Sequence, residues 1–429
     1  MAKKILLVNP PVYDFTAYDF WLKPYGVLSV GGYLRGKAEF SLFDFMDRLH
    51  PFMEGTRGLE SDEFGRGRFY EEKIAPPECF KEIPRYWRRT GLPRKIFAEF
   101  LQNSGSLDYV FIQTVMTYWY QGAAEVIEDI RRYQPQAKIV LGGNYATLCP
   151  QHAKGLGADF VLSGVDLRPL WDYLQMEADY MQPSLWELYP KLETGVMKLT
   201  DGCAFNCTYC SVPQVYKKFI VRPAGRAAAE LKLLLDCGVK QVAFYDDALL
   251  HQSEEVLIPF LQEVISMEIK VNFHTPNALN ARFVTLHLAE LMVEAGFKTF
   301  FLGFESKAVE WQNGTGGKIY SEELVEAVKL LKQAGAIAKN ITTYQIIGHP
   351  GTSIQEVEES MRFVNSLGIR CMLADFSPIP GTPDGEYCRK WVNMDEPLMH
   401  NKTVFPIILL GNDKINYFKQ LHRDLNRTL

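Results

Sequence analysis

The segment Thr200-Asp201-Gly202-Cys203-Ala204-Phe205-Asn206-Cys207-Thr208-Tyr209-Cys210 carries three cysteines with the spacing C-x3-C-x2-C. Three thiolates on one short loop can hold three corners of a cubane iron–sulfur cluster and leave the fourth iron open. A structural zinc site needs a fourth Cys or His close by. The next cysteine, Cys237, falls on a predicted helix. The spacing therefore favours a [4Fe–4S] cluster on Cys203, Cys207 and Cys210. A zinc site and a chance grouping of three cysteines are the alternatives.

Around this loop the chain alternates between predicted strands and helices. The strands are expected at residues 196–199, 241–245, 270–274, 299–303, 342–347 and 371–376. The helices are expected to begin near Ala224, Ser253, Thr285, Ser321 and Ser353, and in the last of these a hydroxyl cap precedes an acidic first turn with Glu356. Six β/α units are fewer than the eight of a full barrel, and right-handed crossovers curl such a series. We therefore predict a partial (β/α)6 barrel over residues 192–385, with the cysteine loop at the end of its first strand.

A second α/β series precedes the barrel. Its strands are expected at residues 4–8, 40–45, 109–113, 138–141 and 158–162, and its helices at 25–34 and 122–133. This order predicts an α/β fold that begins with a Rossmann-like doubly wound sheet over residues 1–165. The stretch 50–104 is rich in Arg, aromatic residues and Pro, and predicts a folded insertion with short helices. Residues 166–191 are expected to be a linker, and 386–429 a small helical tail.

Composition excludes several classes of protein. The 429 residues carry a net charge of −5, which gives no reason to expect nucleic acid. No apolar run approaches the ~18 residues of a membrane span, and the apolar stretch that follows Lys4 is too short for a signal peptide. Three of the eight cysteines cluster on one loop and the other five are scattered, which favours a metal site over a disulfide framework. We expect a cytoplasmic protein without a membrane span.

The cysteine loop, with Tyr209 directly before its last cysteine, resembles the hallmark of the radical S-adenosylmethionine (radical SAM) superfamily. The resemblance covers about residues 192–385. It implies that the open iron binds the amino and carboxylate groups of SAM, and that an electron from the cluster cleaves SAM. The products in that superfamily are methionine and a 5′-deoxyadenosyl radical, which abstracts hydrogen from the substrate. An electron donor such as flavodoxin or ferredoxin is the implied partner.

Polar residues follow the predicted strands at the edge where barrel enzymes place their sites. The resemblance implies that Asp246 and Asp247 contact the amino group of SAM, that Glu305 binds the ribose hydroxyls, and that the segment with Gly348 contacts adenine. The third strand ends in a segment that contributes His274 and Asn277. Each segment taken singly is also an ordinary turn. His274 and His349 are ambiguous, because a lone histidine is more often a structural hydrogen-bond partner than a ligand.

The N-terminal half resembles the cobalamin-binding domains that precede some radical SAM barrels. The resemblance is carried by Asn9-Pro10-Pro11, by Lys23-Pro24-Tyr25-Gly26 and by Leu141-Gly142-Gly143. It implies a corrin ring over the loops that follow Val8, Gln113 and Leu141. No histidine precedes His50, so the cobalt would receive no lower ligand from the first loop. The alternative is a degenerate sheet that only shapes a substrate pocket.

Together the two resemblances imply a cobalamin-dependent radical SAM methyltransferase that acts on an unactivated carbon of a small molecule or peptide. A radical cyclisation, rearrangement or oxidation without methyl transfer remains an alternative. A non-catalytic corrinoid-binding protein is the second alternative. The sequence identifies neither a catalytic side chain nor the substrate or oligomeric state.

Overall fold

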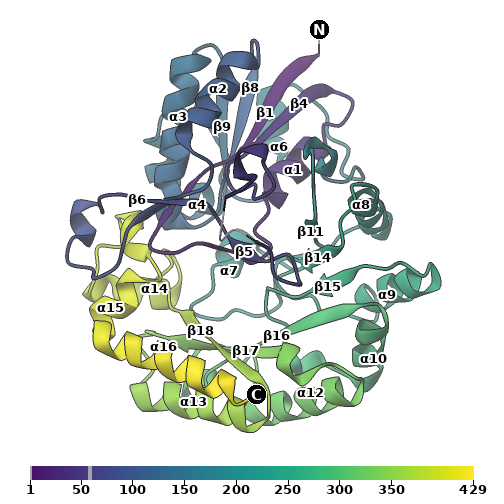
Figure 1. Cartoon of the computed structure of the whole chain (residues 1–429), viewed down its shortest axis with the longest axis vertical. Helices are drawn as coiled ribbons and strands as arrows, with labels where there is room; N and C mark the ends of the chain where they lie inside the picture. Colours follow the sequence, from purple (N-terminus) through teal and green to yellow (C-terminus); the bar gives the residue numbers. More distant parts are fainter. Residues whose placement is uncertain (1, 57–59) are drawn as a thin grey trace. The chain divides into compact units, whose positions relative to one another are not determined.

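The computed structural model describes residues 2–56 and 60–429, and the chain forms two compact units. Unit 1 comprises Met1–Gly195 and Gly225–Val239, and unit 2 comprises Val196–Ala224 and Lys240–Leu429. The chain therefore passes from one unit to the other three times, as the colours of Figure 1 allow the reader to follow.

A five-stranded sheet with the order β10-β9-β8-β1-β4 forms the centre of unit 1. Every neighbouring pair in it is parallel. Its strands are β1 (Lys3–Asn9), β4 (Ala38–Asp44), β8 (Tyr109–Thr114), β9 (Lys138–Gly143) and β10 (Phe160–Val161). Both faces of such a sheet are covered, which is why the first strand is a continuous apolar run. The predicted doubly wound sheet is confirmed.

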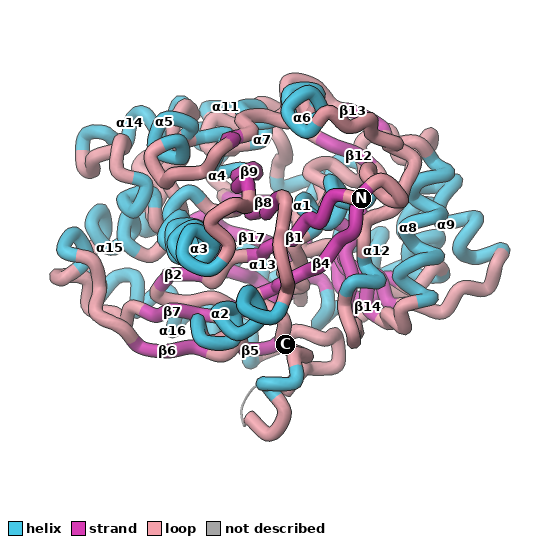
Figure 2. The backbone as a smooth tube through the Cα atoms, turned by 90° about the horizontal axis from the view of Figure 1, so that it is seen from above, coloured by secondary structure: helices cyan, strands magenta, loops and turns pink. Residues whose placement is uncertain are grey.

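Helices follow the strands of unit 1 as the crossovers of a parallel sheet require. They are α1 (Tyr25–Gly32), α2 (Arg94–Asn103), α3 (Tyr120–Tyr133), α4 (Asn144–Leu148), α5 (Pro150–Lys154) and α6 (Arg168–Leu174). In Figures 1 and 2, α1 and α3 lie on opposite sides of β8. The two faces of the sheet are therefore covered by the helices that follow its first and third strands in the chain.

The insertion at 50–104 differs from its prediction, because short strands accompany its helical segments. It contains β5 (Gly67–Arg68), β6 (Glu71–Lys73) and β7 (Arg88–Thr90), besides 3₁₀ turns and α2. Strand β7 pairs antiparallel with β6 and with β2 (Val12–Asp14), and β5 pairs with β3 (Tyr18–Asp19). The sequence did not reveal β7, because the strand contains charged residues. Arg89 is buried there in a two-point ion pair with Glu125.

The linker before the barrel is packed into unit 1 together with α8 (Ala224–Asp236). The carboxylate of Glu230 on α8 is buried, and it accepts hydrogen bonds from the Ser184 N–H at 2.9 Å and from Trp186 Nε1 at 2.5 Å. Arg226, one turn earlier, donates to the hydroxyl of Ser29 on α1 at 2.6 Å. Buried charges need such partners, so α8 and the linker stabilise each other.

Unit 2 is built on a six-stranded sheet with the order β11-β14-β15-β16-β17-β18. These strands are β11 (Thr194–Met197), β14 (Gln241–Phe244), β15 (Asn272–His274), β16 (Phe297–Glu305), β17 (Ile341–Ile347) and β18 (Arg370–Asp375). The pairs from β14 to β18 are parallel. Chain order and sheet order agree throughout, as the predicted partial barrel requires.

The helices of unit 2 are α7 (Val212–Val215), α9 (Leu257–Ser266), α10 (Leu286–Glu294), α11 (Val309–Gly314), α12 (Ser321–Gln333) and α13 (Ile354–Ser366). The capping box expected at Ser353 is present, because its side chain accepts from the Glu356 N–H and the Glu356 carboxylate accepts from the Ser353 N–H. The tail contributes α14 (Pro383–Tyr387), α15 (Val404–Leu410) and α16 (Asn412–Arg427). Within the described residues, none of the helices combines the length and the apolar character that crossing a membrane requires.

Candidate functional site

The cysteine loop of unit 2 is closed at its base by two short antiparallel strands, β12 (Thr200–Asp201) and β13 (Ile220–Val221). Arg222 makes a two-point ion pair with Asp201, at 2.6 and 2.9 Å. Gly202, directly before the first cysteine, has a φ of +77°, and a Cβ there would lie 2.5 Å from the carbonyl oxygen of Lys218. Only glycine fits this position, so the start of the loop is fixed by the backbone.

The three thiols lie on this loop, and, besides burial, the charge of Cys207 contributes to the pKa of Cys210. The Phe205 N–H donates to Cys203 Sγ at 3.4 Å, and the Val212 N–H donates to Cys210 Sγ at 3.5 Å. Burial raises the pKa of Cys207, and it raises the pKa of Cys210 to about 12. In the part of the chain that the structure describes, no three His, Cys, Asp or Glu side chains are arranged to hold a metal ion. The donor set is nevertheless the one a cubane cluster uses, and binding it would displace the thiol protons.

A lysine that the sequence did not single out lies beside these thiols. Lys318 Nζ is 3.4 Å from Glu305 Oε1, and a Cβ at Gly303 would lie 2.8 Å from the same nitrogen. Burial lowers the pKa of Lys318, but the charges of Glu305 and of the three cysteines outweigh burial, and the pKa is raised. The ion pair with Glu305 thus favours the charged form of Lys318. No local signal marked it, since a single lysine in a loop is ordinarily a surface residue.

Glu305 has strained backbone geometry at the end of β16. Its φ is +60°, and the pairing of β16 with β17 shifts register between Gly303 and Glu305. A residue with a side chain pays about 1–2 kcal/mol for this left-handed conformation. Such strain gathers at functional sites. The bulge leaves the predicted ribose-binding carboxylate largely buried, at 9% exposure, and next to Lys318.

Asp246 at the end of β14 has one satisfied and one unsatisfied oxygen. Its Oδ1 accepts from the Leu199 N–H at 2.9 Å, the Thr200 N–H at 2.6 Å and the Thr200 hydroxyl at 2.7 Å. Its Oδ2 is buried and accepts no hydrogen bond from the described residues. The neighbouring Asp247 lies 3.6 Å from Lys198 Nζ. Burial raises the pKa of Asp246 to about 6. Asp247 Oδ2 is likewise buried without a hydrogen bond from the described residues, so a cationic ligand group can satisfy either of the two oxygens.

His274 has a different environment from the one the resemblance implied. The residue is fully buried, with Nδ1 3.0 Å from Thr299 Oγ1 and Nε2 2.8 Å from Gln241 Oε1. Both ring nitrogens are therefore engaged across three strands of the sheet. This is the structural role that a lone histidine usually has, and we leave His274 out of the proposed site.

Gly348 and Asn277 also make contacts within the protein. Gly348 has a φ of +82°, and a Cβ there would lie 2.5 Å from Cβ of Pro406 on α15. Its lack of a side chain is thus required by packing of the tail. Asn277 is exposed and donates from Nδ2 to the carbonyl oxygen of Tyr245 at 3.0 Å. Asn277 remains accessible to a ligand at the strand ends.

A chain of contacts joins the cysteine loop to later parts of unit 2. The ring of Tyr209 stacks on Trp311, with centroids 5.6 Å apart. Trp311 Nε1 donates to His349 Nδ1 at 3.2 Å, and His349 Nε2 lies 2.9 Å from Asp384 Oδ2. The same carboxylate oxygen accepts from the Thr208 hydroxyl at 2.6 Å. Of these residues the sequence singled out Tyr209 and, as an ambiguous case, His349.

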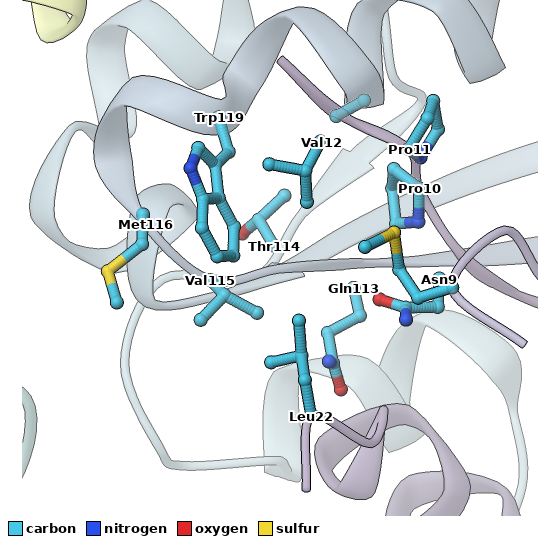
Figure 3. Close-up of a pocket in the computed structure, with 12 residues that line it drawn as sticks. Asn9, Pro10, Pro11, Val12, Leu22, Gln113, Thr114, Val115, Met116 and Trp119 are labelled. Atoms are coloured by element: carbon cyan, nitrogen blue, oxygen red, sulfur yellow. The ribbon is translucent and has the colours of Figure 1, made fainter. Parts of the chain in front are cut away.

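Unit 1 has a pocket at the carboxyl ends of β1 and β8 (Figure 3). Strand β1 lies between β4 and β8, so its crossovers run to opposite sides and this edge is the switch point where α/β sheets bind ligands. The residues that line the pocket are mainly apolar, and no histidine is among them: Asn9, Pro10, Pro11, Val12, Leu22, Met46, Gln113, Thr114, Val115, Met116, Trp119 and Ala123. Three of the predicted cobalamin-site residues, Asn9, Pro10 and Gln113, thus line one pocket.

Two polar residues of this pocket are oriented by the fold. Gln113 Oε1 accepts from the Val27 N–H at 3.0 Å, near the start of α1, and a Cβ at Gly26 would lie only 3.0 Å from that oxygen. Asn9 Nδ2 donates to Asp44 Oδ1 at 2.7 Å. Both side chains are therefore held in place at the pocket wall.

The two predicted glycines at the end of β9 differ in what the fold demands of them. Gly143 has a φ of +111°, and a Cβ there would lie 2.1 Å from the carbonyl oxygen of Thr114. A Cβ at Gly142 would meet only Leu162, at an ordinary 3.7 Å. The backbone requires Gly143, whereas the protein itself leaves room at Gly142.

Comparison with known proteins agrees with the loop geometry of unit 2. The model of the Radical SAM superfamily matches residues 197–364. This chain contains a radical SAM domain. The match begins in β11, includes the cysteine loop and ends within α13.

Curated relatives of the radical SAM domain are methyl- and methylthiotransferases. An uncharacterized methyltransferase of Pyrococcus horikoshii is 28% identical over 199 residues, which cover 45% of this chain and 41% of the relative. The threonylcarbamoyladenosine tRNA methylthiotransferase MtaB of Thermotoga maritima is 23% identical and covers 60% of this chain and 63% of its own length. The chain thus matches less than two thirds of the length of either relative.

Solved structures share the fold of more of the chain. The radical SAM methyltransferase TsrM of Kitasatospora setae, with tryptophan and a SAM analogue bound, has a TM-score of 0.67 at 15% identity, and the alignment covers 91% of this chain and 76% of TsrM. The cobalamin-dependent SAM radical enzyme OxsB has a TM-score of 0.56 at 14% identity, with coverage of 99% and 61%. The sheet that precedes the radical SAM domain is therefore part of the shared fold.

Proposed function

We propose that this chain is a cobalamin-dependent radical SAM enzyme that transfers a methyl group to an unactivated carbon. The observation that carries the proposal is the pairing, in one chain, of a three-cysteine loop in unit 2 with an apolar pocket free of histidine in unit 1. The pocket lies at the sheet edge where a ligand of a doubly wound fold binds.

On the cluster side, Cys203, Cys207 and Cys210 would hold a [4Fe–4S] cluster. When bound, such a cluster supplies the electron that cleaves SAM to methionine and a 5′-deoxyadenosyl radical. The free Oδ2 of Asp246 is placed to accept a hydrogen bond from a cationic amino group. Glu305 offers carboxylate oxygens to ribose hydroxyls. These residues would bind and orient SAM.

On the corrinoid side, the apolar wall of the unit 1 pocket would exclude water from a large flat ring. When bound, methylcobalamin supplies the methyl group. A Cβ at Gly142 would not clash with the protein, so the fold does not require a glycine at this end of β9. The space that the missing side chain leaves would be available to the ligand. The Gln113 side chain, held at the start of α1, offers its amide nitrogen as a donor to a polar group of the ligand.

Support for methyl transfer comes from the relatives. TsrM is described as a methyltransferase, and the two curated relatives are a methyltransferase and a methylthiotransferase. The substrate class stays broad, since these relatives act on unlike molecules. A small molecule or a peptide is the class we expect.

The test is anaerobic reconstitution followed by assay with SAM and a low-potential reductant. We expect about four irons per chain, as one cubane cluster implies, and formation of 5′-deoxyadenosine that is lost in Cys203→Ala and kept in the matched control Cys237→Ala. Added cobalamin should bind and acquire deuterium from SAM labelled in its methyl group. One tightly bound zinc without iron would overturn the proposal, and deoxyadenosine formation without corrinoid binding would remove its cobalamin part.

A further inference from the structure

Asp384, in the first turn of α14, makes two hydrogen bonds to Thr208 of the cysteine loop. Asp384 Oδ2 accepts from the Thr208 hydroxyl at 2.6 Å, and the Asp384 N–H donates to the Thr208 carbonyl oxygen at 3.2 Å. Thr208 follows Cys207 and stands two residues before Cys210. A two-point contact at this residue restrains the backbone that carries both cysteines. Hydrogen bonds to a carboxylate are among the stronger ones in proteins.

Asp384 is itself held by His349, whose tautomer follows from its partners. His349 Nδ1 accepts from two donors, the Gly351 N–H at 3.0 Å and Trp311 Nε1 at 3.2 Å. A ring nitrogen that accepts carries no proton. The proton of this neutral ring is therefore on Nε2, and it is donated to Asp384 Oδ2 at 2.9 Å. These hydrogen bonds lower the pKa of Asp384 against the effect of burial, which raises it. The carboxylate stays ionised and accepts from both sides.

The contacts of Asp384 with Thr208 and His349, here called the clamp, are anchored in an apolar cluster that belongs largely to the tail. Trp311 packs in the same buried cluster as Phe376, Cys388 and Phe405. Its ring stacks on Tyr209, one residue beyond Thr208. Thr208 and Tyr209 are thus both fixed to elements that follow them by more than 100 residues.

We propose that Asp384 and His349 are positioning residues, which hold the Thr208–Tyr209 backbone so that Cys207 and Cys210 are preset to receive the iron–sulfur cluster. The inference rests on the proposed function for the identity of the cluster. Asp384 lies beyond residue 364, where the radical SAM match ends. Helix α14 therefore contributes to the site through a contact that the family model does not cover.

The test compares variants that remove one hydrogen bond with variants that keep it. Thr208→Val removes the hydroxyl at nearly constant shape, and Thr208→Ser retains it. Asp384→Ala removes the acceptor, and Asp384→Asn retains an oxygen there. Two readouts are taken: the rate at which iodoacetamide alkylates Cys207 and Cys210 in the iron-free chain, and the rate at which a chelator removes iron from the reconstituted chain.

We expect Thr208→Val and Asp384→Ala to accelerate alkylation and iron loss about tenfold, as the loss of about 1.4 kcal/mol implies. Thr208→Ser and Asp384→Asn should stay within about twofold of wild type. Unchanged rates in both disruptive variants, at unchanged circular dichroism, would overturn the inference. If Thr208→Val fails to fold, Asp384→Ala alone decides. If the wild type takes up no iron, the proposed function fails, while faster alkylation in the disruptive variants still supports the clamp.

Discussion

Glu305 Oε1 lies 3.4 Å from Lys318 Nζ, and Glu305 reaches this position only with a left-handed backbone, at a φ of +60°. The strain at the end of β16 is thus coupled to an ion pair beside the three cysteines. The charges of Glu305 and of the three cysteines raise the pKa of Lys318, so its ammonium would add positive charge near a bound cluster.

Lys318→Met should lower the reduction potential of the reconstituted cluster. Reduction adds negative charge, and a nearby cation stabilises the reduced state. We expect a shift on the order of −60 mV, the equivalent of a tenfold change in a one-electron equilibrium. Redox titration followed by electron paramagnetic resonance measures it. Lys318→Arg, which keeps the charge, is the control. A potential that is the same in Lys318→Met and wild type would show that the ammonium is screened.

Gly142→Val should lose corrinoid binding, whereas Gly143→Ala should lose stability. A side chain at Gly142 meets only Leu162 at an ordinary distance, so the sheet should stay folded while corrinoid binding is lost. Gly143→Ala forces a Cβ against the Thr114 carbonyl at a positive φ, and should cost about 1–3 kcal/mol of stability. Thermal denaturation and the visible absorption of bound cobalamin separate the two outcomes. Full cobalamin binding by folded Gly142→Val would place the ring elsewhere.

The Co(II) form of bound cobalamin should show no nitrogen from a protein histidine. The described residues that line the unit 1 pocket include no imidazole. An axial nitrogen splits each cobalt line of the paramagnetic resonance spectrum into a triplet. Growth of the protein with ¹⁵N-histidine would turn such triplets into doublets if a histidine were the ligand. A spectrum that changes with this label would contradict the pocket assignment.

Stability should fall as pH rises from about 4 to about 7, in part because of Asp246. Burial raises the pKa of its carboxyl from 3.8 to about 6. Between these values the folded chain keeps a proton that the unfolded chain has lost, so stability declines with pH across this window. Asp246→Asn cannot ionise and should remove about 2–3 kcal/mol of that decline. Urea denaturation of the iron-free protein at pH 4.5 and pH 7 measures it. Equal declines in both proteins would mean that the buried carboxyl does not titrate there.

Local patterns were enough to predict most of the fold. The strand–helix alternation placed the sheets, and the Ser353 cap placed the start of α13, because both signals lie within a few residues. The cysteine spacing likewise indicated the loop chemistry. Strand β7 was missed because it contains the charged residue Arg89, whose partner, Glu125, is distant in the chain.

The long-range contacts that hold the site residues in place could not be predicted from local patterns. The contact of Thr208 with Asp384 joins residues 176 positions apart, and no local pattern encodes it. Glycines are ambiguous for another reason: the predicted ligand contact of Gly348 stays a prediction, while the packing of Pro406 against this position by itself requires a glycine. A glycine signals that something approaches the backbone, and the sequence does not say whether that is a cofactor or the chain itself.

The placement of α8 determines when the N-terminal sheet can complete its folding during synthesis. The buried carboxylate of Glu230 is the acceptor for Ser184 and Trp186, which precede it by more than 40 residues. During synthesis, Ser184 and Trp186 lack this acceptor until α8 has left the ribosome. A fragment cut at the end of the linker reproduces that unfinished state permanently, so expression of the N-terminal domain should succeed only when the helix is supplied with it.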